Sequence, residues 1–498
     1  MARLNDQRLV TVSIMLATVM QVLDTTIANV ALPHMQGSLS ASTDQITWVL
    51  TSYIVAAAIM TPTVGFMASR LGRRRLFLWS VAGFTVTSGL CGLSASLDQM
   101  VMFRILQGVF GAALVPLSQA VLLDAYPVEK HGQAMAIWGM GVMVGPILGP
   151  TLGGWLTEWY SWRWVFYINL PFGLLAFAGI WLSVSETETR RVRFDVMGFA
   201  YLGLAIGAFQ LMLDRGEHLQ WFDSFEIQFE GVLALLGLYL FVVHSLTRKD
   251  PFIDPALFRD RNFVTGLVFI FVVGIILLAT MALLPPFLQQ WKDYPAATTG
   301  LVLAPRGLGS MFSMMLVGRL MRTRLDPRVL VITGLLFITF SLHQMAGFTL
   351  EVSRNALIWT GVLQGLGLGL VFVPASTLTY ATLNPSLRTE GASLFSLSRN
   401  LGSSVGISIM TAMLSRNMWI NQQQLGEHLQ LAPWLSQGLP MKDMVGSVPA
   451  AVYQTLLSQA AEISYMNDFR LLMWINMAAI PLVFLLRHQQ RPATPTAG

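Results

Sequence analysis

The stretch GMGVMVGPILGPTLGGW, residues 139–155, combines many glycines with two prolines inside one apolar run. Small residues let transmembrane helices pack backbone to backbone, and prolines bend a helix. Close packing alone would account for the glycines. Glycines together with prolines four residues apart indicate a helix at an interface that rearranges during a conformational change. We therefore predict a conformational role for Gly145, Pro146, Gly149 and Pro150.

The composition places this helix in a membrane. Of 498 residues, 54% are hydrophobic and 11% are charged, whereas a soluble domain carries about 25% charged residues. The single cysteine, Cys91, excludes a disulfide framework and a cysteine-based metal site. We expect an all-α, polytopic membrane protein.

Transmembrane segments can be located by their length, because about 20 apolar residues cross about 30 Å of hydrocarbon. By this criterion we predict fourteen spans. They cover residues 9–31, 46–68, 76–96, 100–123, 134–157, 164–184, 196–214, 228–246, 264–287, 297–321, 328–349, 355–382, 391–415 and 467–487. Basic residues concentrate in the connections on the side of the amino terminus, so the positive-inside rule predicts that both termini are cytoplasmic.

Two pairs of segments resemble each other and indicate an internal repeat. LQGVFGAALVP (106–116) is similar to LQGLGLGLVFVP (363–374), and VGFMASRLGRRRLFL (64–78) is similar to VGRLMRTRLDPRVLV (317–331). Transporters are built from such repeats, with the substrate site at the repeat interface. We predict an amino-terminal six-helix bundle (1–184), a linker with an inserted hairpin (185–247) and a carboxy-terminal six-helix bundle (248–498). The last contains a polar, Gln-rich loop (417–466) expected to cap the outer face.

One acid lies inside the first span, in VLDTTIANVALP (22–33). An ionised carboxylate there costs about 2.5–3.5 kcal/mol or more. It could be a packing acid bonded to a neighbour, but Thr or Asn would pack at lower cost. Burial disfavours the charged form of a carboxyl group, so we predict that Asp24 couples transport to protons. Arg104 either snorkels to the inner surface or pairs with an acid; it is the candidate counter-charge, although we expect it at a lower depth than Asp24.

Other polar residues in apolar spans are candidates for the lining of a substrate cavity. Arg306 and Arg399 could instead snorkel to a surface. The set comprises Gln21, Thr25, Asn29, Gln107, Arg306, Gln364 and Arg399.

Several motifs together resemble the major facilitator superfamily. They are LDTTIANVALP (23–33), the basic turn GFMASRLGRRR (65–75), RILQG (104–108), GPILGPTLGG (145–154) and WRWVFYINLP (162–171). The set is most similar to the fourteen-span drug:proton antiporters of the EmrB/QacA type. The resemblance implies two bundles rocking around a central cavity and efflux of hydrophobic or amphipathic toxic compounds across a bacterial inner membrane. It also implies a proton gradient as the driving force with no cofactor, an EmrA-like periplasmic adaptor and a TolC-like outer-membrane channel.

The basic turn departs from the superfamily pattern at one position. Gly65 is expected to allow a close helix approach and Gly72 a tight turn, while Arg70 and Arg73 hold the loop at the anionic inner leaflet. Where this chain has Ser69, the superfamily usually has an aspartate in the lock of the inner gate. We predict that Asp124 supplies the missing acid.

Three classes of function are compatible with a polytopic membrane protein: a proton-coupled exporter of many drugs, a carrier for one metabolite, and a membrane-embedded enzyme. No span carries the usual catalytic groups, so the enzyme is the weakest. The 27 Met, 29 Phe and 14 Trp favour a pocket that accepts many shapes. If Arg104, Arg306 and Arg399 face the cavity, weak acids and neutral compounds should be preferred over dications.

Overall fold

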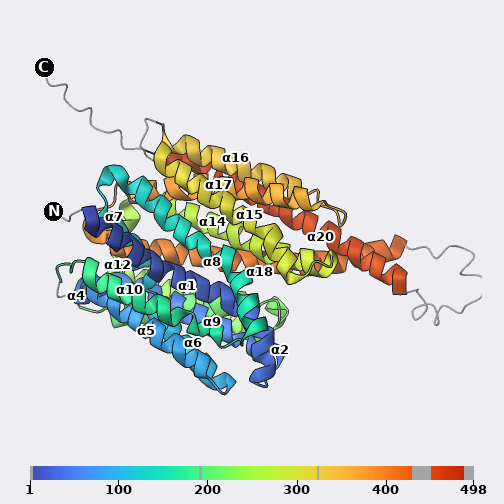
Figure 1. Ribbon diagram of the computed structural model, residues 1–498, viewed down its shortest axis with the longest axis horizontal. Coiled ribbons are helices and arrows are strands. Elements are labelled where there is room, and N and C mark those ends of the chain that lie inside the picture. Colours follow the sequence, from blue (N-terminus) through green and yellow to red (C-terminus); the bar gives the residue numbers. More distant parts are fainter. Residues whose placement is uncertain (1–3, 190–192, 322–324, 429–449, 487–498) are drawn as a thin grey trace, which may run out of the picture.

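The computed structural model describes residues 4–189, 193–321, 325–428 and 450–486. Every regular element in these ranges is a helix. Long helices lie roughly parallel or antiparallel to one another (Figure 1), as expected for a chain whose backbone polar groups must be satisfied within each span.

The amino-terminal elements run from residue 4 to residue 183. They are α1 (Leu4–Ser38), α2 (Thr43–Ile46), α3 (Trp48–Met60), α4 (Val64–Leu71), α5 (Arg73–Leu93), α6 (Leu97–Gly111), α7 (Leu114–Ala125), α8 (His131–Trp159), α9 (Trp164–Tyr167) and α10 (Asn169–Ser183). Two predicted spans are each made of two consecutive helices, α3 with α4 and α6 with α7. A short 3-10 turn containing Pro62 separates α3 from α4.

The remaining elements begin with a helical hairpin. It consists of α11 (Val196–Arg215) and α12 (Phe225–Thr247). Then follow α13 (Ala256–Arg259), α14 (Arg261–Pro286), α15 (Ala296–Leu320), α16 (Pro327–Met345), α17 (Arg354–Ala381), α18 (Arg388–His428) and α20 (Ala450–Ala479).

Thirteen helical segments in the described ranges are long and apolar enough to cross a membrane, and they match thirteen of the predicted spans. The remaining prediction, 391–415, lies within α18, which is long enough but too rich in serine and glycine to meet the same apolarity. This helix packs against α14, α20, α7, α4 and α11. A helix enclosed by others can carry polar residues on faces that lipid does not touch.

The prediction of a loop over residues 417–466 is wrong at both ends of this range. The chain continues as helix to His428 in α18 and is helical again from Ala450 in α20. Residues 429–449 of that prediction lie outside the described residues. The two helices pack on each other, and their paired ends project from the body of the molecule rather than covering it (Figure 1). The polar composition of these positions suits a solvated helix pair as well as a loop.

The glycine-rich helix α8 forms the centre of the packing. It contacts α1 on one side and α15 on the other. A Cβ on Gly145 would lie 2.8 Å from the Val22 carbonyl oxygen, and one on Gly139 would lie 2.8 Å from the Met314 sulfur. The glycines therefore allow close approach in both directions, as the sequence predicts. Pro146 and Pro150 lie within α8, which continues from His131 to Trp159.

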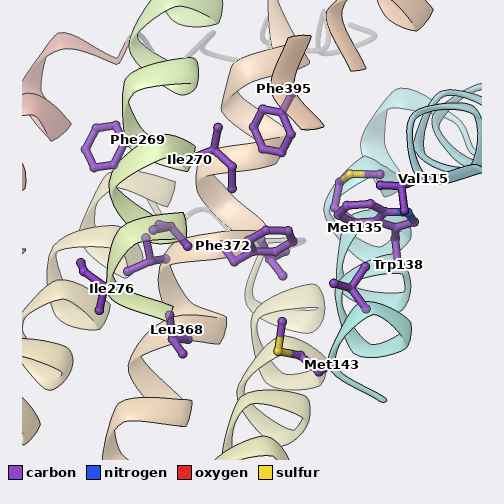
Figure 2. Packing of buried hydrophobic residues seen from close by; sticks show 14 of the residues in the cluster. Val115, Met135, Trp138, Met143, Phe269, Ile270, Ile276, Leu368, Phe372 and Phe395 are labelled. Carbon is purple, nitrogen blue, oxygen red and sulfur yellow. The ribbon is translucent and has the colours of Figure 1, made fainter. Parts of the chain in front are cut away.

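Buried hydrophobic side chains join the first and last thirds of the chain into one core. Figure 2 shows Trp138 of α8 and Phe372 of α17 within this core. Their rings stack with centroids 5.7 Å apart. This apolar contact positions the amino-terminal helices against the carboxy-terminal ones.

Candidate functional site

Asp24 lies at the centre of a buried polar network in the amino-terminal helices. Its side chain is 0% exposed. The carboxylate oxygen Oδ2 accepts from Arg104 Nη1 at 2.7 Å. The other oxygen, Oδ1, accepts from Gln107 Nε2 at 2.9 Å and from Asn169 Nδ2 at 2.8 Å. Three donors from two neighbouring helices thus stabilise a charged carboxylate that lipid would not tolerate.

The guanidinium of Arg104 is held by more than its acid. Its Nε donates to the Val49 carbonyl oxygen at 2.9 Å. Its Cζ lies 4.3 Å from the centroid of the Tyr53 ring and 5.7 Å from that of Phe166. Cation–π contacts are stronger in a desolvated site, so these groups support the cation even when its carboxylate partner changes charge.

The expected difference in depth between Asp24 and Arg104 is wrong. Gln7 Nε2 at the start of α1 donates to the carbonyl oxygen of Ala125 at the end of α7, at 3.0 Å. The chain through α6 and α7 is therefore antiparallel to α1. Arg104, in the middle of α6, lies level with Asp24 and bonds to it. The snorkelling alternative for Arg104 also fails, because its side chain is 0% exposed.

Asn169 completes the network and was not identified from the sequence. It lies at the start of α10 and also donates to Ser88 Oγ at 3.0 Å. The signal was present, because an amide inside the aromatic run WRWVFYINLP is expensive unless it has partners.

The other candidates on α1 lie outside this network. Gln21 Nε2 donates to the Tyr53 hydroxyl at 3.2 Å, one step from Arg104. The Thr25 hydroxyl donates to the Val22 carbonyl of its own helix, and Asn29 is exposed. The structure thus brings Gln107 to Asp24 but neither Thr25 nor Asn29.

The carboxy-terminal helices contain a related layer without an acid. Gln364 Nε2 on α17 donates to Thr280 Oγ1 on α14 at 3.3 Å. One turn earlier on α14, the Leu277 carbonyl accepts from Arg306 Nη2 at 3.2 Å. Arg306 is 7% exposed, and none of the described carboxylates lies within salt-bridge distance of it.

The internal repeat relates these two layers. Gln107 and Gln364 occupy the same place in LQGVFGAALVP and LQGLGLGLVFVP. Asp24 lies 20 residues after the first residue of α1, and Thr280 lies 19 residues after the first residue of α14. Gln107 therefore contacts α1, and Gln364 contacts α14, at equivalent positions of the repeat. The partner is the Asp24 carboxylate in the first case and the Thr280 hydroxyl in the second.

A third arginine lies where the two groups of helices meet. Arg399 of α18 has its Cζ 5.9 Å from the centroid of the Trp138 ring on α8. Nearby, the Tyr380 hydroxyl of α17 donates to Gln119 Oε1 of α7 at 3.2 Å. Aromatic and hydrogen-bonding side chains thus alternate along this interface, and Trp138, Gln119 and Tyr380 were not identified from the sequence.

Asp124 connects the basic turn to α18. It forms an ion pair with Arg73, and its Oδ1 accepts from Arg388 Nη1 at 2.8 Å. The Nε of Arg73 also donates to Thr389 Oγ1 at 2.7 Å. The structure therefore brings the predicted acid to the predicted arginine and adds Arg388 as a second partner. The hydroxyl of Ser69, at the usual position of the acid, donates to the Gly65 carbonyl of its own helix.

The same end of the molecule is closed by backbone contact. A Cβ on Gly65 would lie 2.8 Å from the Cα of Glu390 in α18. Gly72 has φ of +86°, which favours glycine, at the turn between α4 and α5. Arg70 is exposed in the last turn of α4.

Gly149 lies elsewhere, in α8. It packs on α1, where a Cβ on this glycine would lie 2.7 Å from Thr26 Cβ.

Comparison with known proteins places this geometry in a family. Residues 14–407 match the family model of the Major Facilitator Superfamily. The chain is 39% identical over 422 residues to the fatty acid resistance protein FarB of Neisseria gonorrhoeae, covering 84% of this chain and 83% of FarB. It is also 39% identical over 427 residues to the multidrug export protein EmrB of Escherichia coli K12, covering 85% of this chain and 82% of EmrB.

Solved structures agree on the fold. The human organic anion transporter MFSD10 superposes with a TM-score of 0.58 at 15% identity, covering 94% of this chain and 99% of that one. A bacterial homologue of the human lysosomal transporter Spinster gives 0.57 at 17% identity, covering 98% of both chains. These findings confirm the resemblance, the all-helical polytopic fold and the assignment as a transporter and not an enzyme. The chain belongs to the major facilitator superfamily and, within it, to the efflux transporters of the EmrB/QacA type.

Proposed function

We propose that this protein is a proton-coupled exporter of hydrophobic and amphipathic toxic compounds, with Asp24 as the coupling acid and Arg104 as its counter-charge. The observation that carries this proposal is the enclosed carboxylate of Asp24 with its three donors. The names of FarB and EmrB, which refer to fatty acid resistance and multidrug export, support this class of substrate.

The network offers a simple way to move a proton. A proton that binds Oδ2 of Asp24 removes the charge that attracts Arg104 Nη1. The Val49 carbonyl and the Tyr53 ring still hold the guanidinium. Rocking of the bundles then exposes the acid to the other side, where the proton leaves and the ion pair forms again. A bound substrate favours the deprotonated state, so the proton and the substrate exclude each other.

The test uses Asp24→Asn, which keeps the shape of the neutral acid. We expect this variant to insert and bind substrate like the wild type but to lose efflux driven by a pH gradient in proteoliposomes. Asp24→Glu should retain part of that efflux. Asp98→Asn is the matched control, because Asp98 is exposed in the first turn of α6. Efflux by the Asp24→Asn variant at the wild-type level and with the same pH dependence would show that another group couples the proton.

A carrier for one metabolite remains the second candidate, because the same fold serves many substrates. The stacked Trp138–Phe372 pair, with Met314 beside it, lies at the interface between the two groups of helices. If rocking of the bundles opens this interface to substrate, its thioether and aromatic groups suit compounds of many shapes. Growth of an exporter-deficient host on a panel of toxic compounds separates the two. Protection against several unrelated compounds supports the drug exporter, and protection against one supports the metabolite carrier.

The proposed setting is a bacterial inner membrane with both termini in the cytoplasm. In that orientation the Asp124 cluster closes the inner side, and the projecting ends of α18 and α20 extend into the periplasm. We propose that they contact an EmrA-like adaptor and, through it, a TolC-like outer-membrane channel. The outer end of the hairpin, where Asp214 bonds Thr51 and Arg215 pairs with Glu226, is the second expected contact. The division into bundles 1–184 and 248–498 with an inserted hairpin at 185–247 belongs to the same proposal.

A further inference from the structure

A second buried acid lies in the carboxy-terminal helices. Asp468 of α20 is 1% exposed. Neither of its carboxyl oxygens accepts a well-formed hydrogen bond from a described group, and the Asn417 side chain of α18 is close enough to give only weak support to the charged form. Its neighbours Phe469 and Leu472 are both 0% exposed. The mechanism built on Asp24 does not use this group.

The groups around Asp468 do not supply a counter-charge. Asn417 faces it from α18, and Tyr465 lies one turn earlier on the same face of α20. Lys292, which follows the π turn after α14, donates to the carbonyls of Leu350 and Val352, at 2.6 and 2.8 Å. No salt bridge to Asp468 occurs in the part of the chain that the structure describes.

The helix that packs beside Asp468 is irregular at this level. After Pro285 and Pro286, α14 continues as a π-helical turn, Phe287–Trp291. The ring of Phe287 packs against that of Tyr465 with centroids 5.1 Å apart. Single π turns occur frequently at functional sites, because they disrupt regular hydrogen bonding and ease rearrangement. The acid therefore lies where α14, α18 and α20 pack together, beside this π turn.

A carboxylate in such surroundings would bear the full cost of desolvation without an ion pair. The protonated form avoids that cost. We propose that Asp468 is a second proton-binding site, which holds a proton in this conformation and releases it when α18 and α20 move apart and admit water. This inference rests on the proposed proton-coupled efflux for its role in transport, but the bound proton itself does not depend on it.

The two acids differ in this one conformation. Asp24 forms an ion pair with Arg104, whereas Asp468 forms no salt bridge with a described residue. In the proposed cycle each acid carries its own proton. Removing Asp468 should lower the number of protons exchanged per substrate by one.

Infrared spectroscopy on the purified full-length protein in lipid tests the bound proton directly. We expect the wild type to show the absorption of a protonated carboxyl group shielded from water. Asp468→Asn and Asp468→Leu should both lose it, and Asp24→Asn should keep it. Asp293→Asn, at an exposed position just after the π turn, is the matched control and should also keep it. An unchanged absorption in both Asp468 variants would overturn the proposal.

The coupling role is measured in proteoliposomes, as the substrate gradient that a given pH gradient sustains. One coupled proton sustains about a tenfold substrate gradient per pH unit. Asp468→Asn should therefore lower the sustained gradient about tenfold at one pH unit, whereas Asp293→Asn should match the wild type. An equal gradient in Asp468→Asn and wild type would overturn the coupling role. A wild type without any pH-driven gradient would contradict the proposed function instead, and the infrared result would still decide whether Asp468 binds a proton.

Discussion

Arg306 is a buried cation that no described acid neutralises, and this bears on the charge of the substrate. Its only described hydrogen bond is to the Leu277 carbonyl, and an isolated cation in a membrane is costly unless an anion or water compensates it. We expect Arg306→Gln to weaken efflux of hydrophobic weak acids while leaving efflux of lipophilic cations unchanged. Arg319→Gln, in the last turn of the same helix, is the control and should change neither. Selective protection by the wild type against dications, with none against acidic uncouplers, would refute this preference.

At the residue scale, the sequence predicted the charged members of the site better than their partners. Asp24 and Arg104 were identifiable because a charge inside an apolar run is expensive. Asn169 and Tyr53 were not, since their role depends on which helices meet, and this is set by tertiary packing. The direction of α6 relative to α1 follows from the order of the predicted spans, because the fourth span runs opposite to the first. The expected depth of Arg104 did not take this into account and was therefore wrong.

At the scale of elements, Asp124 holds α18 against the turn between α4 and α5. Its two arginines come from different parts of the chain, Arg73 from α5 and Arg388 from α18. Substitutions of two residues that interact with each other usually show a coupling energy of roughly 0.5–3 kcal/mol in a double-mutant cycle. We expect non-additive effects on transport rate when Asp124→Asn is combined with Arg73→Gln or with Arg388→Gln.

The control for this cycle is Arg70, an exposed residue one turn before Arg73. Asp124→Asn combined with Arg70→Gln should give additive effects, because the two side chains form no described contact. Additivity in all three cycles would mean that Asp124 does not lock this end of the molecule.

Helix α18, which contains the predicted span at 391–415, shows why hydropathy alone does not identify every span. Its serines donate inward to other helices, as Ser398 does to the Leu267 carbonyl at 2.8 Å and Ser403 does to the Gly274 carbonyl at 3.4 Å. Hydropathy reflects how well side chains suit lipid. A helix enclosed by other helices can therefore have a low mean hydropathy and still cross the membrane. The apolar helices on the outside, such as α12, were located readily because lipid dictates their composition.

At the scale of the whole molecule, the paired ends of α18 and α20 extend beyond the bundle (Figure 1). Gln422 Nε2 contacts the Tyr453 hydroxyl at 3.4 Å, so the two helices lie side by side at this level. A short Gly/Ser linker can therefore replace residues 425–451 without moving the spans.

We expect this deletion to preserve folding and efflux from proteoliposomes but to lower whole-cell resistance, because a pump that cannot dock its adaptor releases its substrate only into the periplasm. A second variant, with residues 425–451 replaced by a Gly/Ser chain of equal length, separates the loss of a binding surface from a change in length. Both variants should lower resistance to a similar degree. Undiminished resistance would exclude a docking role for this region, and a loss of efflux from proteoliposomes would assign the segment to transport itself.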